Sequence, residues 1–132
     1  MIAGEVPQPP ITHTLGFALS AADEGYARFE GEAAEFQYNP IGSVHGGVAC
    51  TMLDSALGCA VMSVLDAQTS YATTQIAVHL TRPITEATGR LIAEANVVHR
   101  GSRMATAEDR LLDAGGKLLA HATTTCLVFP RQ

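Results

Sequence analysis

The chain has 132 residues, of which 47% are hydrophobic and 16% charged, and its formal net charge is −5 at pH 7. This length suits one domain with a real core, and the composition is that of a folded protein rather than a disordered one. With only eight basic residues, the chain lacks the basic face with which a general nucleic-acid binder neutralises phosphates. We therefore expect a single globular domain that does not bind nucleic acid.

The amino-terminal segment and the cysteines favour a cytoplasmic protein. Residues 1–12 form a proline-rich lead-in, expected to be flexible, ahead of a single domain over residues 13–132. The lead-in has neither the basic nor the apolar region of a signal peptide. Cys50, Cys59 and Cys126 are odd in number and lack metal-ligand spacing, so we expect reduced structural thiols, no metal and no cofactor.

Two short strands are expected first, over Leu15–Ala21 and Tyr26–Glu32. The Asp-Glu-Gly sequence at residues 23–25 predicts the turn between them. In the second strand polar and apolar residues alternate, which is the two-residue period of a half-buried strand.

A turn over Asn39–Gly47 leads into an apolar segment, Val48–Leu65, that is interrupted by a single charge at Asp54. The segment is long enough to span a membrane. The acid at its middle, the glycines at its start and the lack of flanking basic residues argue against a membrane span. Because a helix that is apolar on all sides is a buried one, we expect a central helix wrapped by the rest of the domain.

After the helix the sequence becomes rich in Thr, Val, Ile and Leu, which favours strands. The glycine-rich stretch at residues 113–117 predicts a hairpin turn. Four strands are expected, over Ala72–Leu80, Leu91–His99, Met104–Leu112 and Leu118–Phe129. The order of elements predicts an α+β fold, an antiparallel sheet with a single helix against one face.

The helix segment holds the residues that best suit chemistry. A lone carboxylate such as Asp54 is costly to bury in its ionised form, so it needs a partner or a role, and apolar surroundings are expected to raise its pKa. Gly46 and Gly47 precede it at the helix start, where free backbone N–H groups stabilise a developing negative oxygen. An acid and such a donor are the minimum needed to hydrolyse an activated acyl group.

The spacing of these groups restricts how they act. Asp54 follows His45 by nine residues, which on a helix is about 900° of rotation and about 13 Å along the axis. One helix therefore cannot bring both groups to one carbonyl. Either they serve separate purposes, or the site is assembled from two copies of the chain across a two-fold axis.

Several candidates also have purely structural interpretations. Asp54 suits a buried acid satisfied by hydrogen bonds, and Asn39 before a proline suits turn chemistry. Thr73 and Thr74 are strand formers in the first instance. The Arg-Gly-Ser-Arg sequence at residues 100–103 fits either a solvated turn or a cationic clamp for phosphate. The sequence contains no G-x-S-x-G elbow, no phosphate-binding loop and no dinucleotide fingerprint.

Three stretches together resemble a known family. They are N-P-I-G-S-V-H-G-G-V-A-C-T-M-L-D-S-A-L-G from Asn39, Y-A-T-T-Q-I-A-V-H-L-T-R-P from Tyr71, and V-V-H-R-G-S-R from Val97. Over residues 15–129 the chain is similar to hotdog-fold acyl-CoA thioesterases, most of all to the phenylacetate-catabolism (PaaI-type) branch. The resemblance implies a sheet wrapped around one helix, paired through edge strands into homodimers and often homotetramers.

The resemblance also implies roles for residues. Asp54 corresponds to the catalytic acid, acting as nucleophile or general base, and the Gly46 N–H polarises the thioester carbonyl. His45 and Asn39 orient the carbonyl and the water from the subunit opposite Asp54. Thr73, or Thr74 after a one-residue shift, supplies a hydroxyl near the acid. Residues implied to contact the CoA moiety are Gly47, Arg82, Arg100, Gly101 and Arg103.

At one position the chain departs from the pattern of some hotdog thioesterases, which argues against the branch with a catalytic Glu. Some hotdog thioesterases carry Glu at the acid position and Thr one helical turn later, whereas this chain has Asp54 and Gly58. We therefore expect a cytoplasmic acyl-CoA thioesterase that needs no cofactor and does not bind membranes. The acyl group stays open. The alternatives are a non-catalytic acyl-CoA-binding module and a hotdog enoyl-CoA hydratase or dehydratase.

Overall fold

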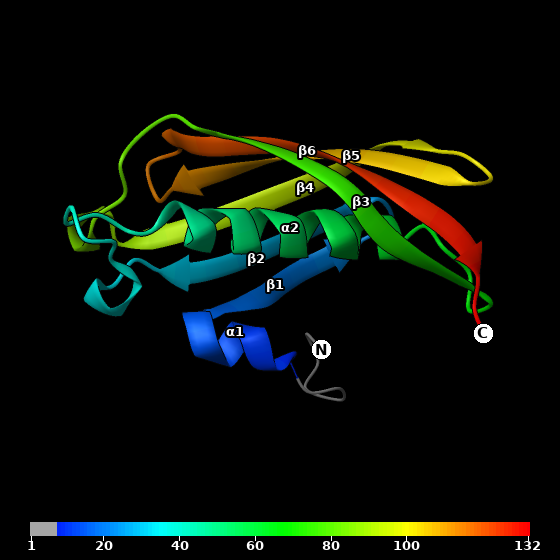
Figure 1. The fold of residues 1–132 in the computed structure, drawn as a ribbon, viewed down its shortest axis with the longest axis horizontal. Helices are drawn as coiled ribbons and strands as arrows, with labels where there is room; N and C mark the ends of the chain where they lie inside the picture. Colours follow the sequence, from blue (N-terminus) through cyan, green and yellow to red (C-terminus); the bar gives the residue numbers. More distant parts are fainter. Residues whose placement is uncertain (1–7) are drawn as a thin grey trace.

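The computed structural model describes residues 8–132, which form a curved six-stranded antiparallel sheet with one long helix packed against its inner face (Figure 1). The helices are α1 (Pro10–Leu15) and α2 (Gly46–Met62), with short 3-10 turns η1 (Glu35–Gln37) and η2 (Glu86–Thr88). The strands are β1 (Phe17–Asp23), β2 (Tyr26–Glu32), β3 (Thr69–Leu80), β4 (Arg90–Arg100), β5 (Met104–Asp113) and β6 (Leu118–Pro130). Their order across the sheet is β1-β2-β4-β5-β6-β3. The predicted sheet with a single long helix against one face is confirmed.

Most element boundaries lie close to those expected, and the differences have local causes. β1 begins at Phe17 rather than Leu15 because α1 occupies the preceding residues and ends at Gly16, whose φ of 79° few side chains tolerate. α2 ends at Met62 rather than at Leu65, and turn hydrogen bonds continue the chain to residue 65. Residues 1–7 of the expected flexible lead-in lie outside the described residues.

The core lies between α2 and the sheet, because the apolar side of α2 meets a sheet face built largely of alanine. Leu53, Leu57 and Val61 of the helix are fully enclosed. Buried alanines of the sheet let the helix approach closely, and they are Ala93, Ala95, Ala105, Ala107, Ala120 and Ala122. Burying each leucine side chain in this way stabilises the fold by about 1.5–3 kcal/mol. No helix within residues 8–132 is both long and apolar enough to cross a membrane.

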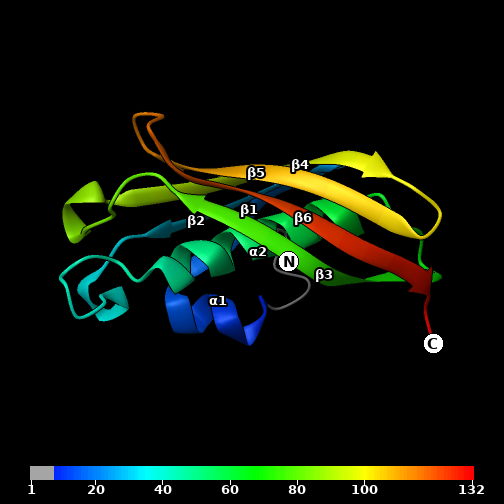
Figure 2. The same cartoon turned by 45° about the horizontal axis from the view of Figure 1, so that its top comes forward.

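β3 forms one edge of the sheet and runs beside α2 (Figures 1 and 2). None of its 12 residues is buried. Two side chains of β3 contact α2 at glycine residues of the helix. A Cβ on Gly58 would stand 2.5 Å from the Tyr71 hydroxyl, and a Cβ on Gly46 would stand 2.7 Å from Leu80 Cδ1. Glycine at these positions therefore lets the edge strand lie close against the helix.

One acid interrupts the apolar side of the sheet. Asp109 of β5 is only 4% exposed and pairs across the sheet with Ala95 of β4 and Ala122 of β6. Neither of its carboxyl oxygens has a hydrogen-bond partner within residues 8–132. Burial, and secondly the charge of Asp54, raise the pKa of Asp109 to about 9. Near neutral pH the group therefore keeps its proton in the folded chain.

This raised pKa makes stability depend on pH. The folded chain holds a proton that unfolded Asp109 releases above its ordinary pKa of 3.8, so stability falls as pH rises from about 4 to about 9. The limiting slope of the unfolding free energy for one proton is about 1.4 kcal/mol per pH unit. Asp109→Asn removes this dependence. We therefore expect the melting temperature of the variant, measured relative to that of wild type, to rise between pH 5 and pH 8.

Thermal unfolding at pH 5, 6.5 and 8 measures this effect, with Glu108→Gln as the matched control. Glu108 is the exposed neighbour of Asp109 in β5. A difference in melting temperature between Asp109→Asn and wild type that stays constant across these pH values would contradict the interpretation.

Candidate active site

The start of α2 is shaped by a histidine folded back over its own helix. His45 is the N-cap residue, and its Nδ1 accepts a hydrogen bond of 2.8 Å from the Gly47 N–H. A Cβ on Gly47 would stand 2.9 Å from that nitrogen, so a side chain there would displace the ring. Because Nδ1 is the acceptor, the neutral ring carries its proton on Nε2, which is a donor for a ligand.

Gly46 is the first residue of the helix and presents a free donor. Its N–H donates to no group within residues 8–132. The unsatisfied amides and the dipole of the 17-residue helix place partial positive charge at this end. A carbonyl oxygen that gains negative charge would be stabilised here.

Asp54 lies in the middle of the same helix, on the side near β3. It is exposed on the single chain and takes part in no hydrogen bond or ion pair within the described residues. Partial burial raises the pKa of its carboxyl, as expected. Its charge also contributes to raising the pKa values of Tyr71 and Asp109, so these side chains are its neighbours.

The structure does not bring the acid and the helix start together within one chain. α2 is continuous from Gly46 to Met62. Asp54 follows Gly46 by eight residues, which corresponds to about 12 Å along the helix axis. The separation inferred from the spacing in the sequence is therefore present in the fold.

Asn39 uses its side chain within its own turn. Its Oδ1 accepts hydrogen bonds from the N–H groups of Ile41 and Ser43, and its Nδ2 donates to the Ser43 hydroxyl. The side chain thus shapes the loop that leads to His45, which is the turn chemistry considered from the sequence.

The two threonines of β3 differ in how their hydroxyls are used. The Thr74 hydroxyl donates to the carbonyl of Thr125 at 3.0 Å, beside an irregularity in the β3–β6 pairing. The Thr73 hydroxyl has only a long contact of 3.7 Å with the Cys126 sulfur. Of the two, Thr73 is the one whose hydroxyl is left for a ligand.

The basic residues implied to hold CoA divide into two groups. Arg100 and Arg103 flank the β4–β5 turn and line a groove of about 410 Å³. The other lining residues are Gln68, Thr69, Ser102, Val128, Phe129 and Pro130. Gly101 closes the turn through its N–H to the Met104 carbonyl, and a Cβ there would stand 2.9 Å from that oxygen. Arg82 follows the end of β3 that is remote from this groove, where its backbone N–H donates to the Leu119 carbonyl.

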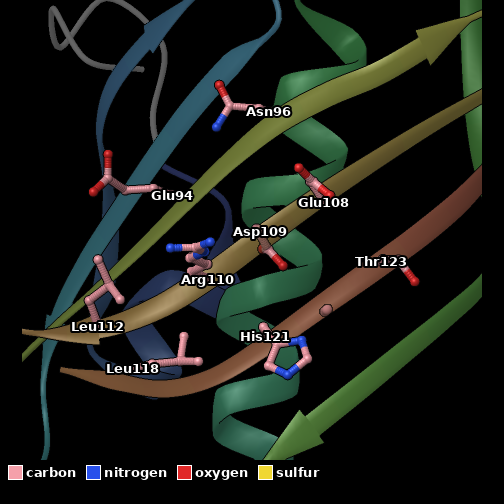
Figure 3. Close-up of a pocket in the computed structure, with 10 residues that line it drawn as sticks. Glu94, Asn96, Glu108, Asp109, Arg110, Leu112, Leu118, His121 and Thr123 are labelled. Carbon is pink, nitrogen blue, oxygen red and sulfur yellow. The ribbon is translucent and has the colours of Figure 1, made fainter. Parts of the chain in front are cut away.

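A second, larger hollow covers the outer face of the sheet (Figure 3). Its volume is about 670 Å³, and it is lined by residues of β4, β5 and β6, among them Glu94, Arg110 and His121. Figure 3 views the strands with α2 behind them. This hollow is therefore separated from Asp54 and Gly46 by the sheet. No cluster of three metal-ligating side chains occurs within residues 8–132.

Sequence reasoning missed Asp109, although a signal for it was present. In β5 the residues Ala105, Ala107, Asp109 and Leu111 have the same parity and are all buried. The two-residue period therefore places Asp109 on the helix side of the strand. An acid in a row of otherwise apolar residues indicates a buried carboxyl at Asp109.

Comparison with known proteins agrees with this architecture. Residues 41–120 match the family model described as the Thioesterase superfamily. AziG from S. sahachiroi is 25% identical, with a TM-score of 0.90 over 95% of this chain and 100% of that one. A phenylacetic acid degradation-related protein from Ralstonia eutropha JMP134, described as a proposed thioesterase, is 32% identical, with a TM-score of 0.85 over 96% of each chain.

A shorter match comes from a proposed esterase of Halobacterium salinarum. It is 45% identical over 69 residues, which are 51% of this chain and 44% of that protein, so this chain aligns with less than half of that relative. The family match covers more than half of the chain and includes α2, β3, β4 and β5. The resemblance drawn from the sequence is therefore confirmed, and the chain belongs to the Thioesterase superfamily, the thioester hydrolases with the hotdog fold.

Proposed function

We propose that the chain hydrolyses acyl-CoA thioesters at a site formed by two copies of itself. Asp54 comes from one subunit, and His45 and Gly46 come from the other. The observation that carries the proposal is the helix α2. Within residues 8–132 it presents a free N–H at its start and an acid without a hydrogen-bond partner about 12 Å further along its axis. These groups complement each other chemically but cannot meet within one chain.

The exposed β3 edge supports a specific way of pairing two copies. Tyr71 packs against Gly58, one turn beyond Asp54, whereas Leu80 packs against Gly46. A long unpaired edge strand is a template for pairing with a second strand. Antiparallel pairing of two β3 strands around a two-fold axis between residues 75 and 76 sets Tyr71 opposite Leu80 of the partner subunit. The acid of each subunit then faces the helix start of the other.

The same pairing gathers the basic residues. It sets Arg82 of the partner subunit opposite Thr69, which lines the groove beside Arg100 and Arg103. Arginine guanidinium groups bind phosphate through paired hydrogen bonds. In a chain with a net charge of −5, a local cluster of this kind is what an anionic CoA moiety requires. Gly47, at the exposed helix start, completes the proposed CoA contacts.

In the proposed reaction the thioester carbonyl oxygen accepts a hydrogen bond from the Gly46 N–H. The His45 Nε2–H, beside the helix start, orients the same carbonyl group. Ionised Asp54 takes a proton from water as the water oxygen bonds to the carbonyl carbon, or it attacks that carbon directly. The negative charge gathers on the oxygen held by Gly46. Collapse of the intermediate breaks the carbon–sulfur bond, and the thiolate of CoA leaves. In the direct route this step leaves a mixed anhydride between the acyl group and Asp54, which water then hydrolyses to the free acid and the Asp54 carboxylate. The raised pKa of Asp54 makes it a stronger base.

The dimer is proposed as the smallest active unit, and a tetramer as an assembly of two such dimers. Asn39 contributes through the loop it holds in front of His45. Thr73 contributes a hydroxyl from the edge strand, where the two subunits meet.

Thiol release from phenylacetyl-, benzoyl-, hexanoyl- and acetyl-CoA tests the activity. We expect release with at least one member, and we expect Asp54→Asn to lower kcat by about 10²–10⁴-fold because the base or nucleophile is lost. Glu24→Gln, an exposed acid in the β1–β2 turn, is the control. CoA esters that bind without thiol release would point to a binding module, and hydration of an enoyl-CoA would point to a hydratase.

Two substitutions at Gly46 separate the effect of losing its N–H from the effect of adding a side chain. Proline is tolerated at the first position of a helix, and the backbone of His45 (φ −57°, ψ 133°) suits a residue that precedes proline. Gly46→Pro removes the N–H, whereas Gly46→Ala keeps it, and both introduce a Cβ beside Leu80. We expect kcat for Gly46→Pro to be about 10²–10³-fold below that of Gly46→Ala. Equal kcat values for the two variants would rule out the N–H as the donor.

A further inference from the structure

The proposed reaction leaves one hydroxyl near the acid without a role, that of Tyr71. The chain has three tyrosines. The Tyr26 hydroxyl donates to Glu94 at 2.7 Å, and the Tyr38 hydroxyl accepts from the Glu86 N–H at 2.7 Å. The Tyr71 hydroxyl makes no hydrogen bond within the part of the chain that the structure describes. Because a half-buried phenol ordinarily pairs its hydroxyl, an unpaired one calls for a ligand or a water.

Packing holds this hydroxyl against α2. Tyr71 lies in the edge strand β3, and its oxygen stands 2.5 Å from the place where a Cβ on Gly58 would be. The phenol therefore takes the space that a side chain at this position of the helix would fill. A phenylalanine ring would cover Gly58 as well, so packing alone does not account for the hydroxyl.

The space above Gly58 lies one helical turn from Asp54, on the same side of α2. Residues four apart on a helix have neighbouring side chains, with about 5–6 Å between their Cβ positions. A water that hydrogen-bonds two oxygens spans about the same distance, because each of its bonds is about 2.8 Å long. The Tyr71 hydroxyl and the Asp54 carboxyl are therefore placed to share one water.

The hydroxyl is open to water and keeps its proton. Tyr71 is half-buried, and its oxygen is not enclosed, because the described side-chain atoms that are both enclosed and unpaired belong to Asp109. Burial, followed by the neighbouring thiols and the Asp54 carboxyl, raises the pKa of Tyr71 to about 12. Near neutral pH the phenol is therefore uncharged, and Asp54 is the base of the two.

The proposed pairing of two chains brings the second half of the site to the same place. It sets Tyr71 opposite Leu80 of the partner subunit. Within one chain Leu80 packs against Gly46, the first residue of α2. A water between Tyr71 and Asp54 then faces a carbonyl that is held at Gly46 of the partner subunit.

We propose that Tyr71 positions the attacking water beside Asp54. The water donates one hydrogen to the Asp54 carboxylate, which takes it as a proton, and the other to the Tyr71 oxygen in a hydrogen bond. The water oxygen then bonds to the carbonyl carbon, while no bond to Tyr71 forms or breaks. This inference rests on the proposed function, because it takes Asp54 to act on water.

Tyr71→Phe tests the role of the hydroxyl, because it keeps the ring over Gly58 and removes the oxygen. On the acyl-CoA that wild type hydrolyses fastest, we expect kcat to fall by about 10–100-fold through loss of orientation. We expect KM and the melting temperature to change little, since the hydroxyl has no partner in the described residues. Tyr26→Phe, which removes a hydroxyl on the outer face of the sheet, should leave kcat unchanged.

A double substitution distinguishes this role from a structural one. If Tyr71 acts only on the water that Asp54 activates, its hydroxyl has no effect once that carboxylate is gone. We expect kcat of Asp54→Asn combined with Tyr71→Phe to lie within about twofold of that of Asp54→Asn alone. A purely structural loss would instead multiply the two effects.

Gly58→Ala displaces the hydroxyl without removing it. Its Cβ would stand 2.5 Å from the Tyr71 oxygen, but 3.3 Å from the ring carbon Cζ, which Tyr71→Phe retains. We expect Gly58→Ala to lower kcat about tenfold or more in wild type, and by no more than about twofold in the Tyr71→Phe background. Equal losses in the two backgrounds would assign the effect to packing and overturn the proposal.

The outcomes separate the inference from the proposed function. If thiol release depends on Asp54 but Tyr71→Phe keeps the wild-type kcat, the inference is wrong and the proposed function stands. The same holds if the losses from Asp54→Asn and Tyr71→Phe multiply. If no thioester is hydrolysed at all, the proposed function fails and the inference fails with it.

Discussion

The regular geometry of α2 is the constraint on which the rest of this account depends. A continuous helix fixes the distance between the Gly46 N–H and the Asp54 carboxyl, and no side-chain rotation closes a gap of about 12 Å. The fold therefore supplies two complementary halves of a site rather than one whole site. The long edge strand β3, with no buried residue, is where a second chain can complete them.

Glycine and alanine prepare the molecule for this arrangement. Gly46 and Gly58 allow β3 to lie close along the helix, so that positions on the edge strand correspond to positions on α2. On the side of α2 that faces the sheet, buried alanines let the helix lie close to the inner face of the sheet. Asp54 consequently lies at a junction between helix, edge strand and sheet, where partial burial strengthens it as a base without sealing it from a ligand.

The sequence predicted the long helix, the four strands after it and the hairpin turn because these rest on local signals: an apolar run, two-residue alternation and glycine-rich turns. It did not predict that β3 pairs with β6 at the edge of the sheet. It did not predict α1, because a six-residue helix in a proline-rich segment has almost no periodic signal. The resemblance implied that Arg82, Arg100 and Arg103 all contact the CoA moiety. In the folded chain a strand length separates Arg82 from Arg100 and Arg103, and only tertiary structure shows this.

Asp109 shows a different limit. The sequence shows on which face of β5 Asp109 lies. That it lacks a hydrogen-bond partner among the described residues depends on which side chains surround it after folding. The turn role of Asn39 was considered from the sequence and is visible in its three side-chain hydrogen bonds. Candidate sites are thus found most readily where local pattern and chemistry coincide, and least readily where chemistry depends on contacts distant in sequence.

Mixing two inactive variants tests the two-chain site most directly. Asp54→Asn and Gly46→Pro, each assayed alone, leave every site with one defective half. When the two are co-expressed, random pairing makes half of the dimers mixed, and each mixed dimer holds one intact site. A site shared between subunits predicts recovery of about a quarter of wild-type thiol release. Activity no higher than the average of the two separate variants would contradict a site shared between subunits.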